Sequence, residues 1–244
     1  MKKIVLILLI VPLLAFAQEG PSLQAAPDLA NNPAALQSGA KLFVNYCLNC
    51  HSASLMRYNR LRDIGLTEDQ IKQNLLFATD KVGDTMTVAM GAKDAKDWFG
   101  AAPPDLSVMA RAKSVDYIYT YLRSYYRDDT RPTGWNNLAY PNTAMPNPLW
   151  QLQGIRSADF VDKDDAETPG MKIHEFEKFN EVTAGSMNAV DFDNAVADIA
   201  AFMDFMAEPA REERHRIGVV VLLFLGIFTF ITWRLNAAFW KDVK

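Results

Sequence analysis

Cysteine and histidine are scarce in this sequence: only two cysteines and three histidines occur among its 244 residues. A zinc site would need more of either residue at ligand spacing, and His174 and His215 stand alone in the chain. Two cysteines can form one disulfide at most, and if both have a role other than a disulfide, none is left to stabilise the fold. Internal repeats and low-complexity tracts are also absent, which excludes a repeat array.

Both cysteines lie in one short segment, where Cys47 and Cys50 are followed at once by His51. Each thiol can add to a haem vinyl group to form a thioether, and the adjacent imidazole can ligate the iron. A turn of helix at this spacing carries both sulfurs along one edge of the porphyrin. The alternatives are a small disulfide or a redox-active CxxC, although a thioredoxin-like dithiol would require a βαβ setting, which is absent. The segment predicts one covalently attached haem c.

The first 17 residues have the form of a secretory signal peptide. Lysines open the chain, an apolar run follows, and Ala15 and Ala17 form a small-x-small cleavage site. An uncleaved anchor is the alternative, but the run is short for a membrane span. We therefore expect the mature chain to begin near Gln18, outside the cytoplasmic membrane, where c-type haem is attached in bacteria.

An uncharged run at residues 217–233 predicts a membrane-spanning helix. It is the core of an expected anchor at residues 211–240, in which Trp233 and Trp240 suit the membrane interface. A cleaved signal followed by one span places residues 18–210 on the periplasmic side of a bacterial inner membrane. Residues 241–244 then form a cytoplasmic tail.

Apolar periodicity predicts a mainly α domain between signal and anchor. Helices are expected from Pro33, after a capping box at Thr67 and Gln70, after Ser114, and from Asp191 to Pro209. Their expected inward faces are Leu36, Ala40, Phe43 and Cys47; Ile71 and Leu75; Val115, Ile118, Leu122 and Tyr125; and Phe192, Val196, Ile199, Met203 and Met206. Asp105 or Ser107 is expected to cap a short helix that carries Arg111.

A loop at residues 127–149 is rich in proline, asparagine and aromatic residues and contains Met145. Haem iron bound by histidine on one side commonly takes methionine sulfur on the other in electron carriers. Prolines around Met145 would stiffen the loop, as a weak thioether ligand requires. Met86 and Met90 are the alternatives, and a single methionine is by default a core residue.

Acidic residues dominate the expected exported domain, with 26 against 17 basic residues at positions 18–210. Nucleic acid is therefore not an expected partner, whereas a basic protein is. Residues 159–181 carry much of this charge. They are interpreted as a solvated surface loop, or as a docking surface that steers a cationic partner.

From residue 33 to the end, the sequence resembles the cytochrome c1 family, the haem-bearing subunits of the cytochrome bc1 complex. The motifs in order are Cys47 to His51 with Ser52, Arg57-Tyr58, Pro103 to Ser107, Arg111, Asp116-Tyr117, the Met145 loop, Ala207-Glu208-Pro209, Glu213-Arg214 and the final span. The resemblance implies a mainly helical c-type cytochrome domain with insertions, anchored by one C-terminal transmembrane helix. It also implies thioethers at Cys47 and Cys50 and iron ligation by His51 and Met145.

Further residues match the family by position. The resemblance implies that Arg111 pairs with a haem propionate, that Pro104 packs near the haem face, and that Tyr125 or Tyr126 lines the pocket. Some members carry an extra disulfide, for which this chain has no cysteines. The stiffness of the Met145 loop is then left to its prolines.

The implied activity is electron transfer from a Rieske iron–sulfur protein to cytochrome c in quinol–cytochrome c oxidoreductase, with cytochrome b as a neighbour and no bond-making catalysis on this chain. The complex would be a dimer. Rival interpretations are a haem-based gas sensor, a haem peroxidase and the haem subunit of a terminal oxidase. A sensor or a peroxidase needs an open position on the iron.

Overall fold

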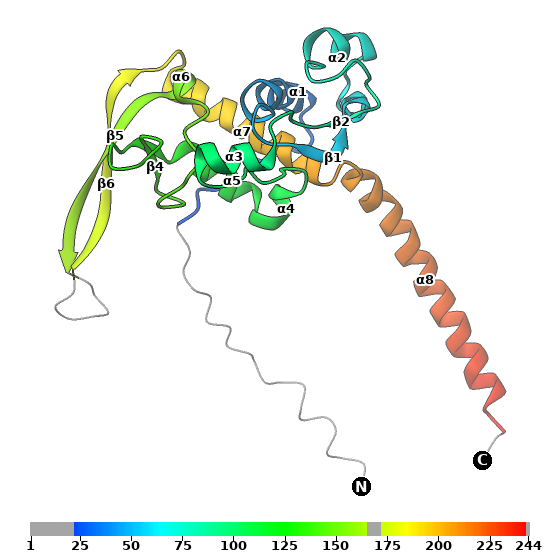
Figure 1. Ribbon diagram of the computed structural model, residues 1–244. Helices are drawn as coiled ribbons and strands as arrows, with labels where there is room; N and C mark the ends of the chain where they lie inside the picture. Colours follow the sequence, from blue (N-terminus) through cyan, green and yellow to red (C-terminus); the bar gives the residue numbers. More distant parts are fainter. Residues whose placement is uncertain (1–21, 165–171, 243–244) are drawn as a thin grey trace.

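Two helices pack against each other at the centre of the described structure, a computed structural model that covers residues 22–164 and 172–242 (Figure 1). They are α1 (Pro33–Leu42) and α7 (Ala189–Ala207). Asn32 caps α1 by accepting from Ala34 N and Ala35 N, and Pro33 occupies the first turn as predicted. The expected signal peptide, residues 1–17, lies outside the described residues.

Gly39 allows α1 and α7 to approach closely. A Cβ atom at this position would lie 2.0 Å from the backbone oxygen of Asp198 and 2.8 Å from Cβ of Phe202. Only glycine fits at this crossing, because no real Cβ approaches a backbone oxygen so closely.

The other elements lie between α1 and α7 in the chain, except α8, which follows α7. In chain order they are a π-helical turn (Phe43–Cys47), β1 (Ala53–Arg57), a 3-10 segment (Tyr58–Ile64), α2 (Glu68–Asn74), β2 (Thr85–Met86), α3 (Ala92–Phe99), α4 (Met109–Lys113), α5 (Val115–Arg123), β3 (Tyr125–Arg127), β4 (Trp135–Asn137), α6 (Trp150–Gln153), β5 (Gly154–Asp164), β6 (Lys172–Ala184) and α8 (Arg211–Phe239).

The predicted helix faces form one buried core. Every residue of those faces is buried except Val115, which is partly buried and packs against the core. The expectation that Tyr125 belongs to the helix after Ser114 was wrong, because α5 ends at Arg123 and Tyr125 lies in β3. The capping box at Thr67 and Gln70 is formed in both directions and opens α2. The helices therefore follow the periodicity of the sequence, and burial of their apolar faces accounts for their packing.

Strands in the described ranges form three two-stranded antiparallel sheets: β1–β2, β3–β4 and β5–β6. The expectation of a surface loop at residues 159–181 was wrong for the described part of that segment, which forms two paired strands. β5 and β6 pair from Gly154 and Ala184 to Asp164 and Lys172, and the hairpin projects from the helical body (Figure 1). Cross-strand aromatic contacts stabilise it, because Phe160 pairs with Phe176 at 6.1 Å between ring centroids.

After Pro209 the chain turns into α8, which leaves the body as a single long helix (Figure 1). Residues Glu213–Phe239 are long and apolar enough to cross a membrane, and an 18-residue window within them has a mean hydropathy of 2.1. The expected core span, residues 217–233, lies within this helix. Ion pairs of Arg211 with Asp204 and of Arg214 with Glu208 connect α8 to the end of α7.

Candidate functional site

The segment with both cysteines and His51 forms one tight turn after α1. The backbone N–H groups of Cys50 and His51 both donate to the carbonyl oxygen of Cys47, at 3.1 and 2.9 Å. Cys47 is buried in the core, Cys50 is partly exposed, and both thiols are free. The turn thus carries two sulfurs and an imidazole within five residues of chain, as attachment of a haem requires.

Neither thiol is activated as a nucleophile. Burial, with a smaller contribution from Cys50, raises the pKa of Cys47 to about 12, and burial also raises the pKa of Cys50. Redox-active dithiols instead have a lowered pKa that stabilises the thiolate, so these values count against a thioredoxin-like pair. Within residues 22–164 and 172–242, no group of three or more His, Cys, Asp or Glu side chains is arranged to hold a metal ion.

His51 is buried, and its ring is fixed by a backbone carbonyl. Nδ1 lies 2.7 Å from the carbonyl oxygen of Pro104. A carbonyl only accepts, so Nδ1 must carry the hydrogen, and Nε2 keeps the lone pair that can bind a metal. Burial lowers the pKa of His51, although the Pro104 bond and the charge of Asp105 oppose the shift. A neutral, oriented imidazole is the form that ligates haem iron, so these residues fit a c-type haem.

Asp105 and Ser107 fix the turn that contains Pro104. The Asp105 carboxylate accepts from the backbone N–H and the hydroxyl of Ser54, at 2.9 and 2.6 Å, and from Ser107 N at 2.8 Å. Ser107 Oγ accepts from Leu55 N at 3.0 Å. The expectation that one of them caps α4 was wrong, because the residue before that helix is Val108. The side chains of Asp105 and Ser107 instead bind β1 and the backbone of the turn that contains Pro104. Partial burial raises the pKa of Asp105, but these hydrogen bonds prevail and hold it at about 2.

Buried asparagines hold the loop that contains Met145. Asn136 Oδ1 accepts from Asn142 N at 2.8 Å, and Asn147 Oδ1 accepts from Leu149 N at 2.9 Å. Asn137, which is 1% exposed, accepts through Oδ1 from the N–H groups of residues 139 and 140. These bonds satisfy loop amides that have no partner in a helix or sheet. The loop is therefore stiffened by these hydrogen bonds as well as by its prolines.

Met145 is partly buried, and its environment is connected to α5. Its backbone N–H donates to Thr143 Oγ1 at 3.3 Å, and that oxygen lies 2.9 Å from the hydroxyl of Tyr121. The Tyr125 hydroxyl donates to the same Tyr121 hydroxyl at 2.7 Å. Met86, an alternative in the sequence analysis, is fully buried in β2 and fills the core. Met90, the other alternative, is partly buried in a loop.

Tyr125 and Tyr126 face different surroundings, because successive side chains of a strand point to opposite faces. Tyr125 is fully buried and belongs to the network beside Met145. Tyr126 packs against Phe160 of the β5–β6 hairpin, at 5.8 Å between ring centroids. The structure therefore brings only Tyr125 into hydrogen-bonded connection with the Met145 loop.

Arg111 and Pro104 are both exposed. Arg111 lies on α4 near the end of α7, where Arg214 and, to a smaller extent, Arg111 lower the pKa of Glu208. Pro104 contributes its carbonyl to His51. Pro104 is thus joined directly to the turn of the two cysteines, whereas Arg111 lies beside a carboxylate of the helix junction.

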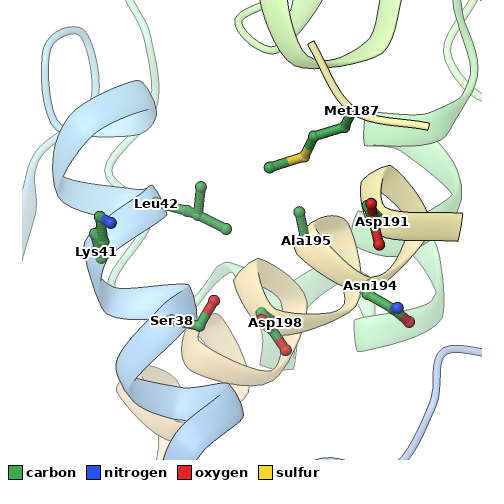
Figure 2. A pocket seen from close by; sticks show the side chains of 8 residues that line it. All are labelled: Ser38, Lys41, Leu42, Met187, Asp191, Asn194, Ala195 and Asp198. Carbon is green, nitrogen blue, oxygen red and sulfur yellow. The ribbon is translucent and has the colours of Figure 1, made fainter. Parts of the chain in front are cut away.

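A shallow cleft lies away from these residues, between α1, α7 and Met187 (Figure 2). It has a volume of about 260 Å³, and Ser38 and Asp198 face each other from the two helices. Burial raises the pKa of Asp198, while a hydrogen bond with Ser38 opposes the shift. None of the candidate residues lines this cleft, so its geometry does not bear on their chemistry.

Sequence reasoning missed Tyr121, Thr143 and Asn137 as residues of the site. Thr143 lies two residues before the expected ligand and the loop is rich in asparagine, but neither pattern shows which side chain bonds which amide. Tyr121 falls outside the predicted apolar face of α5, and a polar tip on a partly buried tyrosine is the signal that could have drawn attention to it.

Comparison with known proteins gives consistent matches over nearly the whole chain. The model of the Cytochrome C1 family matches residues 29–243. Cytochrome c1 of Allochromatium vinosum is 43% identical over 247 residues, covering 100% of both chains. The ammonia monooxygenase gamma subunit of Nitrosomonas europaea is 39% identical, covering 99% of this chain and 98% of its own. Cytochrome c1 of Rhodospirillum rubrum is 28% identical over 86% of this chain and 82% of its own.

Proposed function

The chain belongs to the cytochrome c1 family, and from this membership we propose that it carries electrons from a Rieske iron–sulfur protein to cytochrome c. It acts as a membrane-anchored cytochrome with a single covalent haem c, within the quinol–cytochrome c oxidoreductase of a respiratory chain. Haem c, when bound, supplies an iron that takes up and releases one electron at a time. The chain itself makes or breaks no substrate bond, so it needs no general acid, base or nucleophile.

The observation that carries this proposal is the hydrogen bond between His51 Nδ1 and the carbonyl oxygen of Pro104. It commits one ring nitrogen and leaves Nε2 for iron, in the tautomer that a ligand requires. Cys47 and Cys50, on the same turn, would form the thioethers. Asp105 keeps the Pro104 turn against β1 and so keeps the imidazole oriented.

Met145 is the proposed second iron ligand. The buried bonds of its loop restrict how far the sulfur can move, and a restricted ligand changes position little between oxidation states. Arg111 would pair with a haem propionate, Pro104 would pack near the haem face, and Tyr125 would line the pocket. Tyr126, the family-based alternative to Tyr125, is less well supported because it packs against the hairpin.

For topology we propose a signal peptide at residues 1–17, a periplasmic haem domain at residues 18–210, an anchor at residues 211–240 and a cytoplasmic tail at residues 241–244. The membrane is a bacterial inner membrane. Relatives from bacteria and the long apolar helix α8 support this arrangement. Cytochrome b would pack beside α8, and the whole complex would be a dimer.

The acidic domain surface would attract a basic cytochrome c at long range. On the β5–β6 hairpin, Lys163 Nζ lies 2.7 Å from a carboxylate oxygen of Glu175, and His174 Nδ1 lies 2.7 Å from a carboxylate oxygen of Asp162. These contacts cross the two strands and stabilise the hairpin itself. Docking would depend on the acidic surface as a whole.

The ligand assignment is tested by replacing Met145 with leucine in the purified complex. Met145→Leu should lower the reduction potential, alter the reduced spectrum and permit carbon monoxide binding, because the thioether closes the sixth position. Met90→Leu is the control and should leave all three unchanged. If the potential and the spectrum change in Met90→Leu but not in Met145→Leu, the assignment of Met145 as the ligand is wrong.

The electron-transfer role is tested by purifying the complex through this chain and assaying quinol–cytochrome c reductase activity. Co-purification of a b-type cytochrome and a Rieske protein supports the proposal. Co-purification of a monooxygenase or a terminal oxidase instead would contradict it. The test must include a monooxygenase because one relative is named as an ammonia monooxygenase subunit. Rapid carbon monoxide binding by the unmodified reduced protein would favour a gas-binding function.

A further inference from the structure

We infer that Tyr121 is a positioning residue for Met145, and that its hydroxyl determines where the methionine sulfur is held. The inference rests on the proposed ligation of iron by Met145. It concerns a residue of α5 that lies 22 positions before Thr143 in the chain and would not itself touch the iron.

The hydroxyl groups of Tyr125, Tyr121 and Thr143 form one continuous chain of hydrogen bonds. The hydroxyl of Tyr125 donates to the oxygen of Tyr121 at 2.7 Å, so Tyr121 has its own hydrogen left to donate. That hydrogen can be donated to Thr143 Oγ1, which lies 2.9 Å away and accepts the backbone N–H of Met145 at 3.3 Å. The chain of bonds therefore runs from the buried Tyr125 to the residue that carries the proposed ligand.

Tyr121 holds the loop at a second point. Its backbone carbonyl accepts from Asn137 Nδ2 at 2.8 Å. Asn137 in turn accepts from two loop amides through its side-chain oxygen. One residue of α5 thus fixes both the end of β4, at Asn137, and the position two residues before Met145.

The ring of Tyr121 has little freedom to relax. It stacks on Tyr117 at 5.9 Å with an interplanar angle of 13°, and it meets Tyr125 edge-on at 5.3 Å. Thr143 is 3% exposed, so water cannot easily replace a lost partner of its hydroxyl. Loss of the Tyr121 hydroxyl should therefore free the loop rather than be compensated locally.

The test uses isosteric variants of the full-length, haem-loaded protein in its complex. Tyr121→Phe and Thr143→Val each remove the shared bond and keep the shape of the side chain. We expect both to lower the reduction potential and to raise the rate of carbon monoxide binding to the reduced protein by roughly two- to tenfold, the factor that one hydrogen bond contributes to a local equilibrium. The double variant should change little beyond Thr143→Val alone, because that substitution already removes the shared bond.

Two variants serve as controls. Thr143→Ser keeps the hydroxyl and should retain the parent potential. Tyr119→Phe removes a hydroxyl from the same helix, where the guanidinium of Arg123 lies 4.6 Å from the centroid of the Tyr119 ring. This variant should leave the reduction potential and the rate of carbon monoxide binding unchanged.

The outcomes separate this inference from the proposed function. If Met145→Leu changes the spectrum but Tyr121→Phe and Thr143→Val behave like Tyr119→Phe, the positioning role of Tyr121 is wrong and the ligand assignment stands. If Met145→Leu itself has no effect, the ligand assignment fails and the inference fails with it. A potential that falls in both hydroxyl variants and is restored in Thr143→Ser supports the inference.

Discussion

The guanidinium of Arg156 lies 3.8 Å from the ring centroid of Phe179, within a site where it is largely removed from water. It also donates to the backbone oxygens of Tyr125, at 3.0 Å, and of Arg123. Burial, together with the nearby charge of Arg123, lowers its pKa to about 10, so it remains charged at neutral pH. Arg156 thus joins the β5–β6 hairpin to the end of α5, next to the network beside Met145.

Arg156→Lys should destabilise the protein by about 2 kcal/mol, because an ammonium cannot reproduce the planar fork that reaches both carbonyls and the ring. The measurement is urea unfolding followed by circular dichroism. Arg60→Lys is the matched control, since Arg60 pairs with Asp63 at 2.8 Å at the surface, and it should change stability by less than about 0.5 kcal/mol. Equal effects of the two substitutions would show that the buried contacts of Arg156 contribute nothing.

Gly39→Ala should destabilise the fold by about 2 kcal/mol or more, because the added methyl group would overlap the backbone of α7. The same substitution at Gly83, where an added Cβ meets nothing within 4 Å, should be nearly neutral. Thermal unfolding of the two variants makes the comparison. An unchanged midpoint for Gly39→Ala would mean that α1 and α7 are farther apart than described.

Asp105 should make the stability depend on pH in acid. Its pKa in the folded protein, about 2, lies below the ordinary value of 3.8, so the ionised form stabilises the fold. This stabilisation is complete above about pH 4 and is lost as the pH falls through about 2. Asp105→Asn should therefore be less stable than the parent at pH 6, and the difference should shrink toward pH 2.

Unfolding midpoints at several pH values test this expectation. Asp80→Asn, at an exposed position, is the control. A difference between Asp105→Asn and the parent that stays constant from pH 6 to pH 2 would contradict the role assigned to the ionised carboxylate.

A chain that stops after Ala210 should lose its attachment to the membrane, because the apolar part of the candidate span in α8 is 0% buried by the described residues. We expect this shortened protein in the soluble fraction after an alkaline wash. A chain that stops after Trp240 keeps the whole helix and should stay in the membrane fraction. Retention of the first chain would point to a second membrane contact on the domain.

The sequence was sufficient for features that depend on local periodicity. Val196 and Ile71 were placed correctly in the core because apolar residues recur at helical spacing, and Thr67 with Gln70 gave the start of α2. The anchor was equally clear from its composition.

Features that depend on distant pairing were not predictable in this way. The β5–β6 hairpin is stabilised by contacts such as Phe160 with Phe176, and its many charges concealed the alternation of a strand. The bond between Tyr121 and Thr143 joins two elements whose relative position only the packed core determines. The tautomer of His51 likewise follows from a carbonyl 53 positions later in the chain.

The amide-rich construction of the Met145 loop has a consequence for maturation. The only two sulfhydryl groups of the chain lie at positions 47 and 50, so the loop closes through Asn136, Asn137 and Asn147 with no need for an oxidant. Enzymes that introduce disulfides into secreted proteins therefore have no constructive part in folding it. In the proposed exported form they would only compete with haem for the same two sulfurs, and a reductant present during haem attachment would help assembly rather than hinder it.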